Sequence, residues 1–221
     1  TGFNPGVISW HTAFWAEDPS WSNPGDGNNV SSWRDYSGNG RTATQGVGAN
    51  QPVYRSSYAS LNGRAAVDFT GSGQYLSTST FTLAQPFTML AIARTTSTAA
   101  QRWLMSDTDG NLAIELNRST TPSMYAGAFV NSTVTMDTSA HMVYGYFAGA
   151  SSFIVCDATK TTGSPGTNGF TARYLSLAYR LGNSPLGGLA FAGIYAGNIE
   201  NDANWSTFKA GVASTYGLTI A

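Results

Sequence analysis

The carboxylates and histidines of this chain are too few and too scattered to predict a catalytic site. Acid–base hydrolysis of a glycosidic bond needs two carboxyl groups about 5 to 9.5 Å apart, and the glutamates are Glu17, Glu115 and Glu200. The histidines, His11 and His141, are far apart and lack the spacing of a zinc site. No Gly-x-Ser-x-Gly nucleophile motif is present. The sequence therefore predicts no catalytic residue and no enzymatic activity.

One short segment has the look of a calcium loop but fits a hairpin turn better. Residues 107–111 (DTDGN) place oxygen ligands at alternate positions, but Leu112 and Arg118 stand where an EF-hand needs glycine and glutamate. Asp109-Gly110 between two apolar runs is a strong signal for a tight β-hairpin. Glu115 alternates with apolar neighbours in the second run, so we expect it on the polar face of that strand.

Aromatic rings beside polar side chains are the remaining candidates for binding, because sugar faces stack on rings while polar groups bond the hydroxyls. Trp15, Trp21 and Asn23 are candidate carbohydrate-binding residues in the N-terminal segment. Tyr144 and Tyr146 form a second candidate pair, since alternate residues of a strand share one face. The competing interpretation is that these rings are buried under the sheet edge or half-buried in a strand.

Two aspartates near glycine-rich turns are candidate calcium ligands. Calcium takes six to eight oxygen atoms, which Asp26, Asp35 and nearby backbone carbonyls could supply. The alternative is structural, with Asp35 accepting backbone N–H groups in a turn beside a core Trp33. That turn would be formed by residues that tolerate a sharp chain reversal, namely Ser37, Gly38, Asn39 and Gly40. Calcium is the one cofactor that the sequence leaves open.

The composition is that of a single, nearly neutral domain covering residues 1–221. The 221 residues include 11 basic and 12 acidic side chains, so no basic surface for nucleic acid is expected. No apolar run approaches the roughly 18 to 20 residues that cross a bilayer. The single cysteine, Cys156, lies in an apolar run and is predicted to be a small buried side chain. Because the sequence opens without Met or a signal segment, we expect a processed product or part of a longer chain.

Short apolar or alternating runs, separated by Gly, Asn, Asp and Pro at intervals of about 8 to 12 residues, predict an antiparallel sandwich or barrel. The segment 11–40 is rich in loop-forming residues. The expected strands are residues 7–10, 41–45, 65–69, 75–79, 87–94, 102–106, 112–117, 123–130, 142–147, 152–157, 174–181 and 189–196.

One helix is predicted near the C-terminus, over about residues 202–216. Its apolar stripe has spacings of three and four, formed by Trp205, Phe208, Val212 and Tyr216. Asn201 is the expected N-cap and Gly217 the expected stop. The stripe needs an apolar partner, so we expect the helix to pack on a sheet.

The segment 30–45 (VSSWRDYSGNGRTATQ) resembles the opening signature of concanavalin A-like, laminin-G-like jelly rolls, in which Trp and Asp precede Ser-Gly-Asn-Gly. Similar matches follow at 52–55 (PVYR), 62–69 (NGRAAVDF), 71–76 (GSGQYL) and 190–195 (AFAGIY). The resemblance implies an all-β, antiparallel two-sheet jelly-roll sandwich with a short C-terminal helix. The Glu-x-Asp-x-x-Glu motif of laminarinase-like glucanases is absent, because Asn117 replaces the aspartate in the nearest text.

Domains of this family occur in phage minor tail and other virion proteins, in adhesins and in secreted bacterial enzymes. The resemblance therefore implies a non-catalytic module, with a phage tail or decoration component that contacts host-surface carbohydrate as the first expectation. Two alternatives stay open, namely a purely architectural capsid or tail protein and a carbohydrate-active hydrolase or lyase. The expected partners are host-surface glycan, other virion proteins or further copies of the chain, and the expected location is a virion or extracellular.

Overall fold

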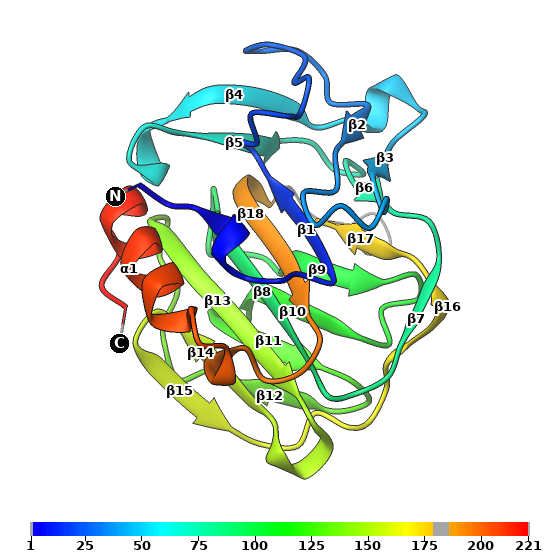
Figure 1. Ribbon diagram of the computed structural model, residues 1–221, viewed down its shortest axis with the longest axis vertical. Coiled ribbons are helices and arrows are strands. Elements are labelled where there is room, and N and C mark those ends of the chain that lie inside the picture. Colours follow the sequence, from blue (N-terminus) through cyan, green and yellow to red (C-terminus); the bar gives the residue numbers. More distant parts are fainter. Residues whose placement is uncertain (1, 179–185, 221) are drawn as a thin grey trace.

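Two antiparallel β-sheets face each other across an apolar core, and one α-helix covers the outer face of the first sheet (Figure 1). This computed structural model describes residues 2–178 and 186–220. The fold class predicted from the sequence is confirmed: an antiparallel two-sheet sandwich with a C-terminal helix. Among the described residues, no helix has the length and apolarity that crossing a membrane would require.

Sheet A carries the long apolar strands. In spatial order it contains β15 (Thr159–Thr162), β14 (Phe153–Cys156), β13 (Ala140–Phe147), β8 (Phe87–Arg94), β18 (Gly187–Tyr195), β5 (Arg64–Phe69) and β4 (Val53–Tyr58), and β1 (Thr12–Trp15) also pairs with β18. The central strands β8 and β18 are almost continuously apolar and buried. A strand has such a continuous apolar sequence when both of its faces are covered by other parts of the protein.

Sheet B has one apolar face and one polar face. In spatial order it contains β12 (Phe129–Asn131), β11 (Thr121–Tyr125), β10 (Ala113–Arg118), β9 (Arg102–Asp107), β17 (Leu175–Leu177), β6 (Leu76–Ser77), β3 (Ala43–Thr44) and β2 (Ser32–Trp33). A separate ribbon joins β7 (Phe81–Leu83) to β16 (Phe170–Arg173). On β10, Ile114 and Leu116 enter the core. Because side chains alternate along a strand, Glu115 lies on the opposite, outer face.

The apolar side chains form two clusters, one on each face of sheet A. The cluster between the sheets includes Trp33, Phe87 and Ile114. The second lies between sheet A and the helix and includes Trp10, Phe191 and Phe208. Burial of each large apolar side chain contributes about 1.5 to 3 kcal/mol, so this helix is part of the folded unit rather than an appendage.

Most of the predicted strands are confirmed to within a few residues, but two are wrong. Residues 7–10 do not form a strand, because Pro5–Val7 forms a 3₁₀ turn that begins at Asn4, whose side chain accepts the Gly6 N–H at 2.9 Å. Residues 123–130 form two strands, since Gly127 at φ 120° reverses the chain between β11 and β12. The strand predicted at 174–181 is observed as β17, and its residues 179–181 lie outside the described residues.

The hairpin predicted at Asp109-Gly110 is confirmed. Strands β9 and β10 pair antiparallel on either side of it, and Gly110 has a left-handed φ of 67°. A hairpin this tight needs a residue that tolerates positive φ, which glycine does at little cost.

The predicted helix is confirmed as α1 (Trp205–Tyr216), although its start lies later than expected. A 3₁₀ turn, η5 (Ile199–Asn201), takes up the residues before it, so Asn204 rather than Asn201 is the N-cap. Gly217 stops the helix with a left-handed φ of 70°. The stripe is buried, as predicted, through Trp205, Phe208, Val212 and Tyr216.

Candidate functional site

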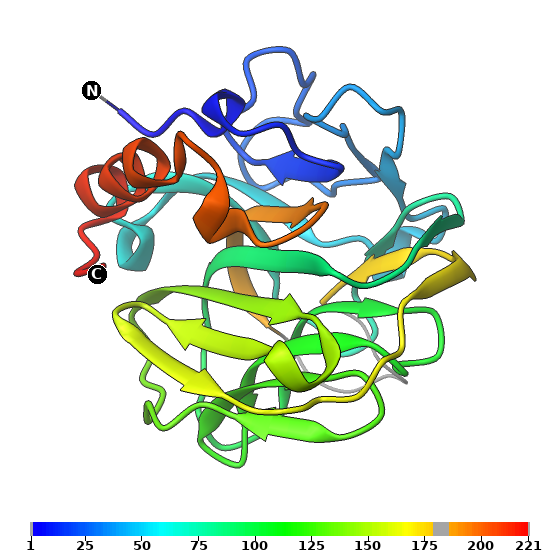
Figure 2. The ribbon, with the colours of Figure 1, turned by 60° about the horizontal axis from the view of Figure 1, so that its bottom comes forward.

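Two hollows lie next to each other at the end of the sandwich where several connections between strands come together. In Figure 2 this end, which includes the η4 turn (Gly149–Ser151), faces the viewer. Both are lined by Thr167. The Arg173 pocket has about 540 Å³ and is lined by Asp107, Asn111, Thr167, Asn168, Gly169, Thr171 and Arg173. The Tyr146 pocket has about 550 Å³ and is lined by Ala84, Gln85, Pro86, Tyr146, Ala148, Gly149, Ser151 and Thr167.

The Arg173 pocket holds a charged cluster at its floor. The guanidinium of Arg173, at the end of β16, lies 3.2 Å from Asp107 Oδ2 and also pairs with Asp109. Asp107 Oδ1 accepts the N–H groups of Asn111 at 2.7 Å and Leu112 at 3.2 Å. Burial raises the pKa of Asp107, opposed by these bonds and by Arg173. The pocket thus presents fixed donors and acceptors, which suit the hydroxyl groups of a saccharide.

The connection between β15 and β16 forms the wall that the two pockets share. Gln85 Nε2 donates to the carbonyls of Asn168 at 2.8 Å and Gly166 at 3.2 Å. Gln85 Oε1 accepts the Gly149 N–H at 2.8 Å. Asn168 in turn donates through its side chain to the Asn111 carbonyl at 3.0 Å. These bonds hold the wall against the connections that contain Gln85, Asn111 and Gly149. The two pockets on either side of this wall form one continuous groove, whose shape is fixed by the protein itself.

Tyr146 is the predicted binding residue that the structure places in this groove. Tyr144 and Tyr146 share the outer face of sheet A, as their spacing predicts. Tyr146 is half-buried, with its ring centroid 5.3 Å from that of Phe153. Tyr144 instead lies under α1 against Trp205 and donates to Glu200 Oε1 at 2.8 Å. Burial, followed by Glu200, raises the pKa of Tyr144. Because Tyr144 is buried and Tyr146 is half-buried, the two tyrosines are not one exposed pair.

The three candidates in the N-terminal segment line neither pocket. Trp21 is buried in a stacked pair with Trp33 and donates to the Ser32 carbonyl at 3.0 Å. Trp15 is half-buried, with its ring edge-on to neighbouring aromatic rings. Asn23 is exposed and accepts the Gly25 N–H at 3.1 Å. These contacts agree with the packing interpretation, and saccharide binding by the three remains a prediction.

Asp35 and Asp26 have separate sets of partners. Asp35 is buried and accepts four hydrogen bonds, from Ala13 N at 3.1 Å, Ser37 N at 3.0 Å, Ser37 Oγ at 2.6 Å and Arg41 N at 2.9 Å. Gly38 and Gly40 within this turn have φ of 80° and 74°. The exposed Asp26 accepts from Ser56, whose backbone N–H chiefly lowers the pKa of Asp26. Calcium binding by either aspartate remains a prediction.

Glu115 lies on the outer face of sheet B, as expected, and is fully buried. The strand register places it between Trp103 of β9 and Ser123 of β11. Gln101 Nε2 donates to its Oε2 at 2.8 Å, and Gln101 also lines a hollow of about 380 Å³. Over the described residues, the register gives this face Glu115 as its one carboxylate, with Ser, Thr, Asn, Arg and aromatic side chains around it.

Sequence reasoning assigned Asp107 and Asn111 to a hairpin turn and did not connect them with Asn168 and Arg173 in the Arg173 pocket. Asn111, Asn168 and Arg173 stand in three different connections or strand ends, and nothing in their spacing brings them together. The one available signal was their position in turns at strand ends, since loops carried by a rigid sandwich often hold binding residues.

No family model matches the chain, and no curated protein matches it. Among solved structures, Trypanosoma rangeli sialidase in complex with sialic acid matches with a TM-score of 0.61 at 11% identity, over 93% of this chain and 33% of that one. A GH54 α-L-arabinofuranosidase matches with a TM-score of 0.60 at 14% identity, over 87% of this chain and 52% of that one. Domain 4 of an extracellular GH43 arabinanase from Geobacillus stearothermophilus, in complex with arabinotriose, matches with a TM-score of 0.56 at 10% identity, over 87% of this chain and 100% of that one.

The structural neighbours are thus carbohydrate-active β-sandwich domains, and the chain spans about a third of the sialidases' length. At 10 to 14% identity the likeness shows the fold. The expectation of a non-catalytic protein is nevertheless overturned, because the matched proteins are glycoside hydrolases. That expectation relied on the scattered carboxylates and histidines and on missing catalytic motifs, whereas activity depends on whichever side chains a fold places at its site. None of the matches described above is a virion protein, so the phage setting gains no support.

Proposed function

We propose that this protein is a carbohydrate-active β-sandwich domain that binds a saccharide chain along the groove formed by the Tyr146 and Arg173 pockets. The observation that carries the proposal is the juxtaposition of a partly accessible aromatic ring with a cluster of fixed polar groups across Thr167. Saccharide recognition requires this combination, because each sugar has apolar C–H faces and many hydroxyl groups.

The two halves of the groove have different tasks. The Tyr146 ring offers a face on which one sugar ring stacks. Arg173, Asn111 and Asn168 offer donors and acceptors to the hydroxyls of the next sugar. Each pocket, at about 540 to 550 Å³, falls within the size range of small-ligand sites. The bound state of the arabinanase domain, which holds arabinotriose, supports the assignment of a short oligosaccharide to a sandwich of this size.

The test is binding of the protein to a panel of neutral and acidic oligosaccharides, including arabino-oligosaccharides and sialylated glycans, measured by calorimetry. We expect Tyr146→Ala to weaken binding about tenfold, since stacking on an aromatic ring contributes about 0.5 to 1.5 kcal/mol in addition to buried area. We expect a similar loss for Arg173→Lys, which keeps the charge beside Asp107 but removes the planar fork of donors.

Tyr195→Ala is the matched control, because Tyr195 is a half-buried tyrosine at the end of β18 that lines neither pocket. It should bind saccharide as the wild type does. If the wild type binds a glycan and both groove variants retain full affinity, the binding site lies elsewhere. If no glycan on the panel binds, the proposed function is wrong.

A second candidate function is hydrolysis of a glycosidic bond at the outer face of sheet B. The observation that favours it is Glu115, a fully buried carboxylate on a polar sheet face, which accepts a hydrogen bond from Gln101, and Gln101 lines a hollow of about 380 Å³. A substrate in the hollow would reach this carboxyl group once Gln101 moves aside. Glu115 could then protonate the leaving oxygen of a glycosidic bond, which typically accelerates cleavage about 10² to 10⁴-fold. A paired-carboxylate mechanism needs a second acid, which the described residues of this face do not supply.

The assay for this activity is release of reducing ends from the same panel. Glu115→Gln keeps the size of the side chain and its bond with Gln101, and should lower the rate by about 10² to 10⁴-fold while leaving saccharide binding in the groove intact. A wild type that releases no reducing ends, or a variant as fast as the wild type, would rule out this role for Glu115.

A further inference from the structure

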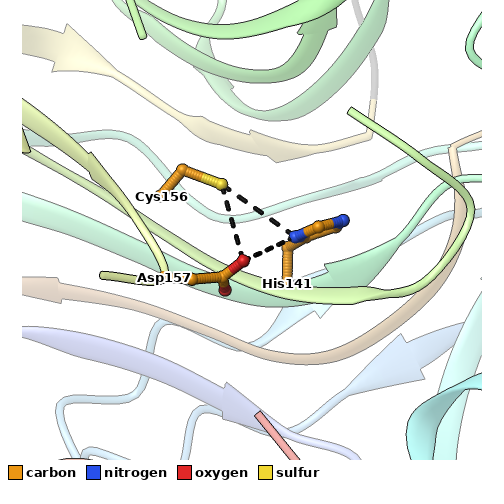
Figure 3. A group of neighbouring side chains, drawn as sticks. All are labelled: His141, Cys156 and Asp157. Carbon is orange, nitrogen blue, oxygen red and sulfur yellow. Dashed lines mark hydrogen bonds and ion pairs between the residues drawn. The ribbon is translucent and has the colours of Figure 1, made fainter. Parts of the chain in front are cut away.

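Three different metal-binding side chains converge at the edge of the core (Figure 3). His141 lies near the start of β13, Cys156 ends β14, and Asp157 follows in the turn to β15. Nδ1 of His141 lies 2.7 Å from Asp157 Oδ2 and 4.0 Å from Cys156 Sγ. The same sulfur lies 3.9 Å from Asp157 Oδ2. The sequence offered no hint of this group, because its members are brought together by the pairing of β13 with β14.

The backbone fixes the orientation of Asp157 in this group. Its N–H donates to the Met142 carbonyl at 2.9 Å, and its Oδ1 accepts the Met142 N–H at 2.9 Å. This pair of bonds leaves Oδ2 directed at the imidazole. Asp157 also has a left-handed φ of 53°, which the tight turn between β14 and β15 requires. One ligand atom is therefore held in place without any ion.

The imidazole of His141 is held from both sides. Its Nε2 lies 3.1 Å from Oδ1 of Asp137, in the connection that precedes β13, and the side chain is 9% exposed. A carboxylate on the far nitrogen is the usual support of a histidine that ligates a metal, since it fixes the ring and makes the other nitrogen more basic. Asp137 therefore provides that support while Nδ1 faces Cys156 and Asp157.

We propose that His141 Nδ1, Cys156 Sγ and Asp157 Oδ2 form a zinc-binding site, with Asp137 as the positioning residue for the imidazole. Thiolate, imidazole and carboxylate are the three ligand classes that Zn²⁺ accepts together, whereas calcium and magnesium prefer oxygen atoms alone. Three protein ligands leave the fourth position of a tetrahedral ion for water or another ligand.

The ligand atoms need to move only slightly to close around an ion. Bond lengths of about 2.0 to 2.3 Å place tetrahedral ligand atoms about 3.3 to 3.7 Å apart. The nitrogen–oxygen separation of 2.7 Å would therefore widen, and the two sulfur separations of 4.0 and 3.9 Å would shorten, each by well under 1 Å. Asp157 is 24% exposed and lines a hollow of about 360 Å³, which gives the ion a route from solvent.

Zinc binding would also change the protonation of Cys156. Its side chain is fully buried, and burial together with the charge of Asp157 raises the pKa of the thiol. Both effects favour the thiol over the thiolate. When zinc binds, the S–H bond of Cys156 breaks and the proton shared by His141 Nδ1 and Asp157 Oδ2 is also released. The three atoms then donate electron pairs to the ion, and both protons leave to solvent.

The test is a titration of the reduced, metal-stripped protein with Co²⁺ and then Zn²⁺. We expect one equivalent of Co²⁺ to produce a thiolate-to-cobalt charge-transfer band, which only Cys156 can supply because the chain has one cysteine. Zinc should displace the cobalt, abolish the band and raise the melting temperature. Cys156→Ser should lose the band, and Asp157→Asn and Asp137→Asn should each weaken zinc binding about tenfold or more.

His11→Gln is the matched control, because it removes the other histidine and leaves the site intact; its zinc affinity should equal that of the wild type. Asp157→Asn retains an oxygen for the Met142 N–H, so it tests ligation without loss of the turn. A wild type that gives no charge-transfer band and no melting shift with equimolar metal would overturn the proposal, whatever the variants do.

Discussion

Replacing Asp35 with alanine is expected to lower the free energy of unfolding by about 3 to 5 kcal/mol, because it removes a buried acceptor of four hydrogen bonds. Three of the donors are the backbone N–H groups of Ala13, Ser37 and Arg41, and the substitution removes the acceptor of each. A buried donor that loses its partner costs about 1 to 3 kcal/mol. The bonds to Ala13 and Arg41 also tie β1 to the start of β3, so the loss reaches both sheets.

The measurement is equilibrium unfolding in urea, followed by circular dichroism, in calcium and in chelator. Asp26→Ala is the matched control, since this exposed aspartate accepts hydrogen bonds from Ser56 alone among the described residues, and the loss of stability should be much smaller. We expect the Asp35 variant to show the same loss in both media, because its oxygens are occupied by protein donors. Stability equal to the wild type would contradict the structural role, and a loss confined to calcium would assign Asp35 to a metal site.

Replacing Gly166 with alanine is expected to cost about 3 kcal/mol or more and to abolish saccharide binding in the groove. Gly166 has a φ of 101°, and a Cβ at this position would overlap the carbonyl oxygen of Ala126. The opposing atoms are backbone, so no side chain can rotate away. Pro165 is also pinned there, because its carbonyl accepts the N–H groups of Ala126 at 2.9 Å and Ala128 at 2.7 Å. The wall that carries Thr167 and Asn168 must therefore shift.

Gly38→Ala is the matched control, because Gly38 also has a left-handed φ, of 80°, but no atom lies within 4 Å of the added Cβ. The Gly38 variant should show only the cost of a left-handed backbone conformation, about 1 to 2 kcal/mol, with no steric overlap. Its saccharide binding should be unchanged. The measurements are the free energy of unfolding of both variants and their affinity, by calorimetry, for the glycan that the wild type binds. Equal stability and equal affinity in the two variants would show that the close approach of Gly166 to Ala126 does not shape the groove.

Local patterns in the amino-acid sequence determine many of the elements of this protein, although strands such as β1, β4 and β15 were not predicted from them. Strand β8 is observed with the predicted bounds, because seven consecutive residues are apolar or β-branched, Pro86 precedes the run and the charged Arg94 ends it. The hairpin at Asp109-Gly110 and the helix stop at Gly217 depend on residues that tolerate positive φ. These features need no distant partner, so composition and period are enough to find them.

The start of the helix and the first strand show where local patterns fail. Asn201 has the side chain of an N-cap, but η5 uses residues 199–201 for a 3₁₀ turn and delays the helix to Trp205. Residues 7–10 alternate as a strand would, yet Trp10 packs against Phe191 under the helix and donates to the Pro5 carbonyl at 2.9 Å. Contacts with distant elements override the local preference in both cases.

The candidate sites were decided by the tertiary structure. Tyr144 and Tyr146 have the same chemistry in the sequence, but α1 buries the first, whereas the second stays half-buried and lines the Tyr146 pocket. His141 and Cys156 meet because β13 and β14 pair in one register, and Arg173 meets Asp107 because β16 ends beside the β9–β10 turn. His141 and Cys156 are 15 residues apart in the chain, and Asp107 and Arg173 are 66 residues apart. Only strand pairing and packing bring such residues within bonding distance. Neither produces a regular spacing of residue types that could be recognised in the sequence.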